Sequence, residues 1–299
     1  MKIALTGASG FIGRNLLPIL QAAGNQVRTF GRTSANVPWD ALAGPPPADA
    51  LAGTDAVVHL LGEPVAQRWT AEVKHRIMES RVRGTRNLVQ ALSAAEQRPR
   101  ILISASAIGY YGGTGDEPAT ETSPPGSGFL AETCVRWEEE AAAAEALGLR
   151  VVRLRIGIVL GRGGGALAEM LGPFRMGAGG PLGSGQQWMS WIHLQDLIEL
   201  VAFVMSNTAM AGPVNATSPQ PVRNADFAHE LASVLHRPAL MHIPKFALRL
   251  RFGEAADEML SSSRVVPAVA LKAGFRYRFP GLRSALEEAA GVPGARQRS

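Results

Sequence analysis

The sequence predicts an α/β fold, a doubly wound parallel sheet followed by a smaller C-terminal α/β lobe. Over the first 160 residues, short apolar runs alternate with stretches of helical spacing, as β-α units require. A glycine-rich turn lies directly between the first run and the first helical stretch. After residue 160, glycine-rich loops at 161–165 and 177–185 interrupt the alternation. We therefore expect a nucleotide-binding domain over residues 1–160 and a substrate lobe over residues 161–299.

The first three elements form a β-α-β opening. Lys2–Thr6 is a short apolar run that ends at glycine, so it predicts a strand. Phe11–Ala23 carries apolar residues at helical spacing, and Gln26–Phe30 predicts the second strand. Two further strands are expected at Asp55–Gly62 and Arg100–Ser104, because nearly continuous apolar runs are typical of parallel strands that are covered on both faces.

Helices separate the later strands. Ala71–Leu92 has helical spacing, and Leu130–Leu147 is rich in alanine and glutamate. Val151–Leu160 predicts one more strand. Beyond it, three helices are expected, over Leu197–Met205, Phe227–Leu235 and Ala285–Ala290, before a frayed tail from Val292.

Composition excludes several classes of protein. With 46% hydrophobic and 18% charged residues over 299 positions, the chain is typical of globular proteins and unlike disordered ones. Cys134 is the only cysteine, which excludes an intrachain disulfide and a cysteine-rich metal site. No histidine, aspartate or glutamate set has metal-ligand spacing, so we predict no metal.

Charge and hydropathy predict the partners and the compartment. The net charge of +5 comes from scattered arginines and four lysines, which does not predict nucleic-acid binding. The start of the chain lacks the apolar segment of a signal peptide, and no run approaches the roughly 18 apolar residues of a membrane span. We expect a soluble, cytoplasmic protein that binds a small, acidic molecule and neither nucleic acid nor membrane. The oligomeric state is left open.

The glycine-rich turn Thr6-Gly7-Ala8-Ser9-Gly10-Phe11-Ile12-Gly13 predicts a dinucleotide site. Gly7 allows a tight turn, Gly10 allows the backbone to approach a pyrophosphate, and Gly13 allows the helix to pack on the strand. The start of the helix supplies N–H groups and the positive end of the helix dipole to the phosphates. The spacing is G-x-x-G-x-x-G.

The end of the second strand predicts NADP(H) rather than NAD(H). In NAD sites an acidic residue at this position binds the 2′-hydroxyl of the ribose. Here the chain continues with Gly31-Arg32-Thr33-Ser34, so a guanidinium and two hydroxyls stand where a 2′-phosphate would lie.

The chain resembles the extended short-chain dehydrogenase/reductase superfamily. The resemblance rests on the glycine turn and on the segments 55–62, 81–88 and 104–112. More narrowly, it resembles the atypical branch called the NAD-dependent epimerase/dehydratase or nucleoside-diphosphate-sugar epimerase-like family. That branch is similar in Gly62-Glu63-Pro64, Arg68-Trp69, Leu160–Gly165, Trp191-Ile192-His193, and a C-terminal domain of unknown function like residues 243–286.

The resemblance implies an NADP-binding Rossmann domain with a smaller lobe over the nicotinamide. Together with the glycine turn it predicts cofactor contacts from four places along the chain. These are Gly7, Ser9, Gly10, Phe11, Ile12 and Gly13; Gly31 and Arg32; Leu60, Leu61, Gly62 and Glu63; and Arg76, Arg81, Ser106 and Val159.

The usual proton relay of that superfamily is absent. Typical members use a Ser or Thr after the fifth strand, which Ser106 matches, and a Tyr-x-x-x-Lys pair on the next helix. The three tyrosines stand at 110, 111 and 277, and none is followed by lysine four residues later. Arg81 also replaces the asparagine that typical members carry before Gly-Thr.

Ser106, Tyr110 and Tyr111 are therefore the catalytic candidates. A phenol with an ordinary pKa of about 10 donates a proton at neutral pH but is a poor base. This favours reduction of a carbonyl over epimerisation. An equally weighted interpretation is that both tyrosines only pack or line the substrate site.

Other polar residues have structural interpretations. His59 lies in an apolar run and is interpreted as a buried, hydrogen-bonded histidine. His193 and Asp196 either anchor a loop that closes on substrate or begin a helix. Cys134 is interpreted as a packing thiol. Asp116, Glu117 and Glu121 are expected to form a solvated acidic loop.

Three functions follow from these observations. The leading hypothesis is an NADP(H)-dependent oxidoreductase that reduces a carbonyl of an unidentified small molecule. The second is a catalytically silent NADP(H)-binding protein that reports the redox state to a partner. The third is a nucleotide-sugar epimerase.

Overall fold

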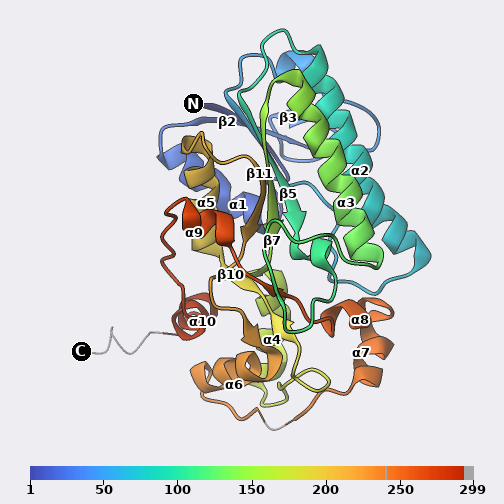
Figure 1. Ribbon diagram of the computed structural model, residues 1–299, viewed down its shortest axis with the longest axis vertical. Helices are drawn as coiled ribbons and strands as arrows, with labels where there is room; N and C mark the ends of the chain where they lie inside the picture. Colours follow the sequence, from blue (N-terminus) through green and yellow to red (C-terminus); the bar gives the residue numbers. More distant parts are fainter. Residues whose placement is uncertain (240, 293–299) are drawn as a thin grey trace.

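Seven parallel strands form the central sheet of the computed structural model, which describes residues 1–239 and 241–292 (Figure 1). The strand order is β11-β7-β5-β4-β1-β2-β3. The strands are β1 (Lys2–Thr6), β2 (Gln26–Gly31), β3 (Val37–Pro38), β4 (Ala56–His59), β5 (Ile101–Ala107), β7 (Arg150–Ile156) and β11 (Gly212–Ala216).

Helices cover both faces of the sheet, which confirms the doubly wound fold. Helices α1 (Phe11–Ala22) and α5 (Leu194–Ser206) cover one face, and α2 (Ala71–Ala94) and α3 (Phe129–Ala142) cover the other (Figure 1). Strand residues alternate between the two cores: Ile3 and Leu5 pack with α1 and α5, whereas Ala4 packs with α2. Both faces of the central strands β1, β4 and β5 are therefore buried, as the apolar runs predicted.

The predicted strand Val151–Leu160 is divided in two. It breaks at Gly157, and its second part, β8 (Ile158–Leu160), leaves the large sheet to pair with β10 (Trp191–His193). A Cβ atom on Gly157 would lie 2.7 Å from the carbonyl oxygen of Ser190. The close approach of these two backbones requires glycine and explains the break.

The chain returns to the large sheet after residue 160. Strand β11 pairs with β7, and α5 packs against the core beneath it. The helix α9 (Ala268–Lys272) and Phe275 also belong to this core. The chain thus leaves the large sheet at Gly157 and returns to it at β11. The division into two domains at residue 160 stays a prediction.

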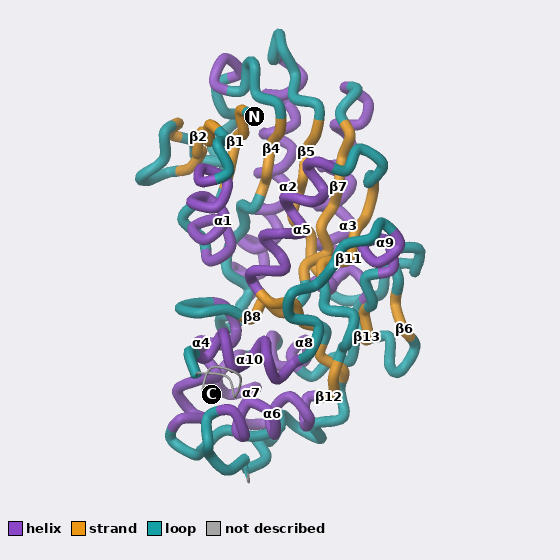
Figure 2. Tube along the Cα trace, turned by 90° about the vertical axis from the view of Figure 1, so that its left-hand side faces the viewer, coloured by secondary structure: helices purple, strands orange, loops and turns teal. Residues whose placement is uncertain are grey.

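The smaller lobe gathers below the carboxyl ends of the strands (Figures 1 and 2). Its core surrounds Trp191 and Phe227 and is built by α4 (Gly165–Arg175), α6 (Asn224–Val234) and α10 (Leu282–Ala290). The last two match the predicted helices at 227–235 and 285–290 but begin three residues earlier. Most of the predicted tail, residues 293–299, lies outside the described residues.

Short elements complete the lobe and join it to the sheet. They are α7 (Lys245–Phe252), α8 (Ala255–Met259) and two strand pairs, β9 (Trp188–Met189) with β12 (Val222–Arg223), and β6 (Pro118–Ala119) with β13 (Arg264–Val265). Short 3₁₀ turns lie at Ala48–Ala50, Ile108–Tyr111 and Ala143–Leu147. Within the described part of the chain, no helix has both the length and the apolar character that a membrane crossing needs.

Candidate functional site

The carboxyl ends of the central strands bring the predicted site residues to one edge of the sheet. Thr6 at the end of β1 stands in register with Phe30 of β2 on one side and with His59 of β4 on the other. Ser106 of β5 stands in register with Arg155 of β7. The loops that follow these strands therefore start side by side, at the edge where ligands bind in open α/β sheets.

The three glycines of the first loop meet three different steric demands. Gly7 has φ 71°, and a Cβ atom there would lie 2.7 Å from the backbone of Leu60. A Cβ atom on Gly13 would lie 2.2 Å from the carbonyl oxygen of Gly7, so α1 packs directly on the turn. At Gly10 the nearest atom to a Cβ would be that same oxygen, at 3.2 Å, and the outer side is open. This cradle fits a pyrophosphate.

The first turn of α1 has free N–H groups. Gly10 is its N-cap, no side chain caps it, and the first turn holds no acidic residue. Ser9 is exposed beside it, whereas Ile12 packs on the core. The ring of Phe11 lies against the glycine-rich loop 161–165, where a Cβ atom on Gly164 would lie 2.3 Å from the ring. The site is thus an uncapped helix N-terminus, which binds anions.

Arg32 is exposed where β2 ends. The strand finishes at Gly31, and Thr33 and Ser34 follow, also exposed, with Ser34 at φ 54°. Among the described residues, Arg32 has no hydrogen-bond or ion-pair partner. Its guanidinium is free to contact a phosphate.

The loop after β4 is fixed by Arg81 of α2. The guanidinium packs against Gly62 so closely that a Cβ atom on that glycine would lie 3.0 Å from Cζ of Arg81. Its Nη1 donates to the carbonyl oxygen of Glu63 over 2.9 Å. The guanidinium of Arg81 also lies over the ring of Trp137, with Cζ 5.1 Å from the ring centroid. Burial lowers the pKa of Arg81. Arg76 is more exposed and pairs with Glu72 and Glu63.

The remaining predicted contacts of the loop and of β8 are apolar. Leu60 and Leu61 are half-buried and pack against the two cores on opposite faces of the sheet. Val159 lies on β8, and a Cβ atom on Gly165 would lie 3.0 Å from its carbonyl oxygen. These three residues lie between the edge of the sheet and the glycine-rich loop 161–165.

A buried polar network begins at Ser106. Its Oγ donates to Oε1 of Glu138 over 2.7 Å. Glu138 forms a two-point ion pair with Arg155, at 2.8 and 2.9 Å. Arg155 also donates to the hydroxyl of Tyr111 over 2.9 Å, and that hydroxyl donates to Oδ1 of Asn215 over 2.6 Å. The network joins β5, α3, β7 and β11.

The two neighbouring tyrosines differ in what their hydroxyls can do. Tyr111 is buried, its hydroxyl is used in two hydrogen bonds, and burial raises its pKa to about 12. Tyr110 is half-buried, and its ring lies on the guanidinium of Arg155, with Cζ 3.4 Å from the centroid. Within the described chain the hydroxyl of Tyr110 makes no hydrogen bond, and the residue is part exposed. The catalytic roles of Ser106, Tyr110 and Tyr111 stay predictions.

Sequence reasoning missed Glu138, Arg155 and Asn215. Arg155 carried a signal, because a charged residue inside the apolar run 151–160 must find a partner if both faces of the strand are covered. The partner itself lies on the preceding helix, 17 residues earlier. Nothing in the sequence connects the two.

Three polar residues outside the site confirm their structural interpretations. His59 is buried between the hydroxyls of Thr6 and Thr85, at 2.7 and 3.0 Å, and burial lowers its pKa to about 4. Cys134 is buried, which raises its pKa to about 12. His193 is the N-cap of α5 and accepts from the N–H of Gln195.

The expected solvated acidic loop is wrong at Glu121. That residue is buried, and its Oε1 accepts from the N–H groups of Asn215 and Val269. A carboxylate is held there because strand β11 and the start of α9 both need an acceptor. Asp116 is exposed but is bonded to Trp188 and Arg223.

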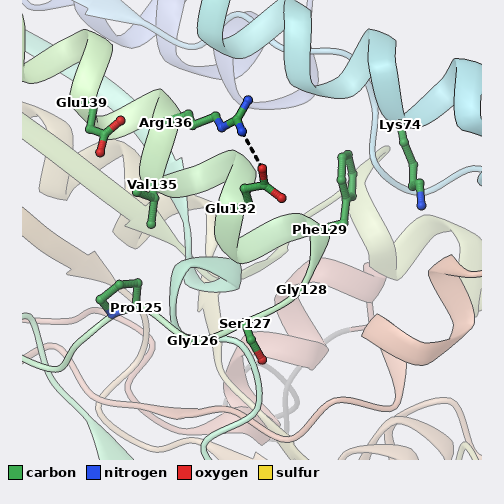
Figure 3. A pocket seen from close by; sticks show the side chains of 10 residues that line it. All are labelled: Lys74, Pro125, Gly126, Ser127, Gly128, Phe129, Glu132, Val135, Arg136 and Glu139. Carbon is green, nitrogen blue, oxygen red and sulfur yellow. Dashed lines mark hydrogen bonds and ion pairs between the residues drawn. The ribbon is translucent and has the colours of Figure 1, made fainter.

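A hollow of about 610 Å³ lies on the outer side of α3 and does not coincide with this site (Figure 3). No predicted cofactor or catalytic residue lines it. Three of the four charged side chains that line it are already paired, Arg136 with Glu132 at 2.7 Å and Lys74 with Glu254 at 2.6 Å, which leaves Glu139 without an ion pair among the described residues. We therefore place the functional site at the sheet edge.

This sheet order, with a glycine cradle after β1, defines a Rossmann-like α/β fold of the NAD(P)-binding type. The chain belongs to the NAD dependent epimerase/dehydratase family, whose pattern matches residues 3–216. Residues 243–289 match a domain of unknown function, DUF1731. Both parts of the resemblance are thereby confirmed.

Related proteins cover nearly the whole chain. The chloroplastic SDR39U1 homolog of Arabidopsis thaliana, an epimerase family protein, is 41% identical over 298 residues, which is 96% of this chain and 86% of that protein. The crystal structure of human SDR39U1 isoform 2 with NADPH has a TM-score of 0.88 at 33% identity and covers 97% of this chain and 99% of that one. A nucleoside-diphosphate sugar epimerase from Corynebacterium glutamicum has a TM-score of 0.81 at 33% identity, over 97% and 58% of the chains.

Proposed function

We propose that the protein is an NADP(H)-dependent oxidoreductase that reduces a carbonyl of a small molecule. The observation that carries this is the cradle of Gly7, Gly10 and Gly13 at an uncapped helix N-terminus, with Arg32 free at the end of the next strand. The human relative, 33% identical over 97% of this chain, was crystallised with NADPH. That likeness supports the same cofactor here.

Different residues at the edge of the sheet would bind different parts of the cofactor. The first turn of α1 would bind the pyrophosphate, and Arg32 would bind the 2′-phosphate. The loop 60–63, fixed by Arg81, leads from there toward Ser106 and Tyr110. When bound, the cofactor supplies a hydride for the carbonyl carbon of a substrate.

The protein's part in the reaction is to hold the substrate and supply a proton. Tyr110, which is part exposed, donates its phenolic proton to the carbonyl oxygen and regains one from solvent. Tyr111 does not compete for this role, because its hydroxyl is buried and donates to Asn215. Ser106 would stabilise the developing alkoxide only if its proton left Glu138. Tyr110 is thus the leading candidate.

A second candidate function is a catalytically silent NADP(H)-binding regulator. The missing Tyr-x-x-x-Lys pair and the commitment of Ser106 and Tyr111 to protein partners favour it. A nucleotide-sugar epimerase is the weaker alternative, because no base that returns a removed proton is evident among the described side chains of the site.

Two measurements separate these functions. Calorimetric titration with NADPH and NADH tests the cofactor, and NADPH oxidation over a panel of aldehydes and ketones tests the chemistry. Once a substrate is found, we expect Tyr110→Phe to slow single-turnover NADPH oxidation at least tenfold and the matched Tyr111→Phe to slow it much less. Binding without turnover on any carbonyl supports the regulator. Equal rates in wild type and Tyr110→Phe would remove Tyr110 from the mechanism.

A further inference from the structure

We propose that Arg155, held in place by Glu138, positions the ring of Tyr110. This inference rests on the proposed function, since it concerns the same site. Neither Arg155 nor Glu138 is itself among the predicted cofactor or catalytic residues, so both act through their neighbours: Glu138 accepts from Ser106, and Arg155 lies against the ring of Tyr110.

The ion pair is buried and rigid. Arg155 is 3% exposed and Glu138 is 5% exposed. Burial by itself lowers the pKa of Arg155, but the hydrogen bonds and the charge of Glu138 outweigh it and raise that pKa above its usual value. The guanidinium therefore stays charged over the whole physiological range. Burying two charges costs solvation energy, and only a well-aligned ion pair with further hydrogen bonds offsets that cost.

Three anchors set the plane of the guanidinium. Nε and one Nη donate to the two oxygens of Glu138, and the other Nη donates to the hydroxyl of Tyr111. Because these bonds lie along the edge of the planar group, its face remains available. Tyr110 lies on that face, with Cζ 3.4 Å from the ring centroid. The orientation of the one accessible phenol of the site thus depends on a residue that sequence reasoning did not single out.

The same carboxylate also binds Ser106. The hydroxyl of Ser106 has one proton, and it donates this proton to Glu138 over 2.7 Å. Because that proton is used within the protein, Tyr110 is the leading proton donor of the site.

The test uses the fact that the chain has only three tyrosines. Full-length protein labelled with 3-fluorotyrosine gives three ¹⁹F resonances, which single Tyr→Phe variants assign to Tyr110, Tyr111 and Tyr277. Arg155→Lys keeps the charge but removes the planar face. We expect it to shift the Tyr110 and Tyr111 resonances and to leave that of Tyr277 unchanged. The matched control Arg153→Lys, two residues away on the same strand, should leave all three in place.

A second measurement works on a chain whose buried ion pair is intact. The side-chain Nε–H signal of Arg155 should lie upfield because of the ring current of Tyr110. Tyr110→Leu should move it downfield, and Tyr110→Phe, which keeps the ring, should not. An unchanged Tyr110 resonance in folded Arg155→Lys, or an Nε–H signal that ignores Tyr110→Leu, would overturn the proposal.

Addition of NADPH separates this inference from the proposed function. If Tyr110 lies beside the cofactor, its ¹⁹F resonance should shift on saturation with NADPH, and Tyr277 should not respond. If NADPH does not bind while Arg155→Lys still shifts Tyr110, the proposed function fails and the positioning role stands. If NADPH shifts Tyr110 but Arg155→Lys does not, the positioning role fails alone.

Discussion

At the scale of single residues, Arg32 tests which cofactor the site selects. It is exposed at the end of β2, and a phosphate placed there gains a charge-assisted hydrogen bond that NADH cannot make. We expect NADPH to bind at least tenfold more tightly than NADH, and Arg32→Ala to abolish most of that difference. Calorimetric titration of both cofactors measures it.

Arg28→Ala is the matched control, because Arg28 is an exposed arginine of the same strand that donates instead to the carbonyl oxygen of Ala50. Its loss should leave the preference intact. Equal affinities for the two cofactors in wild type would refute the role of Arg32.

His59 makes the stability of the fold depend on pH. Burial lowers its pKa from 6.5 to about 4, so between those values the unfolded chain binds a proton that the folded chain refuses. The contribution of His59 is therefore complete above pH 6.5 and is lost as pH falls toward 4, by up to about 3 kcal/mol. His59→Gln should flatten the fall in the free energy of unfolding over this range, whereas the exposed His229→Gln should not. Urea titrations at successive pH values give the comparison.

The sequence could predict residues whose chemistry is local and not those whose role depends on a distant partner. His59 was recognised because a histidine inside an apolar strand is buried whatever surrounds it. Glu121 was misplaced because its partners, Asn215 and Val269, are 94 and 148 residues away. Glu138 was missed for the same reason, since its function depends on Arg155.

At the scale of elements, the glycines of the first loop have different roles: Gly10 is expected to serve cofactor binding, and Gly13 the packing of α1. Gly10 has extended dihedral angles, φ −70° and ψ 170°, which valine also adopts, and one side of it is open. We expect Gly10→Val to abolish NADPH binding while the fold stays intact, because the new side chain fills the cradle. Circular dichroism and calorimetric titration decide this together.

Gly13→Ala is the paired variant, and we expect it to destabilise the fold. Its Cβ atom would meet the carbonyl oxygen of Gly7 at 2.2 Å, so α1 must move away from the turn. The cost should be about 1–3 kcal/mol of unfolding free energy. Normal NADPH binding by Gly10→Val would mean that the phosphates lie elsewhere.

Elements with strong periodicity were predictable, and one that lacks an apolar run was not. Strands β1 to β5 of the large sheet, apart from the two-residue β3, and the helices α1 to α3 follow the patterns of the sequence. Strand β11 was missed because Gly212–Ala216 contains glycine, proline and asparagine, which no strand pattern favours. Its pairing with β7 and the acceptor Glu121 hold it in place instead.

At the scale of the whole molecule, the C-terminal segment connects the core of the sheet with the core of the lobe. The segment that follows α9 places Phe275 in the core beneath the sheet, and α10 belongs to the core of the lobe. Between them, Asp196 at the start of α5 accepts from the N–H groups of Arg278 and Phe279, at 2.7 and 3.1 Å. Of the two interpretations of Asp196 that the sequence allowed, neither foresaw that it joins the C-terminal segment to α5.

This junction predicts how the molecule unfolds. Asp196 is fully buried, and Asp196→Ala leaves two part-buried N–H groups without their acceptor, which should cost about 2–4 kcal/mol. The exposed Asp226→Ala, in the first turn of α6, should cost no more than about 1 kcal/mol. Because the C-terminal segment connects the core of the sheet with the core of the lobe, both variants should unfold in a single transition. Circular dichroism and tryptophan fluorescence should give the same midpoint, since Trp39 lies in a core of the sheet and Trp191 in the core of the lobe. Two separate midpoints in Asp196→Ala would show that the lobe folds on its own and that the C-terminal segment does not couple it to the sheet.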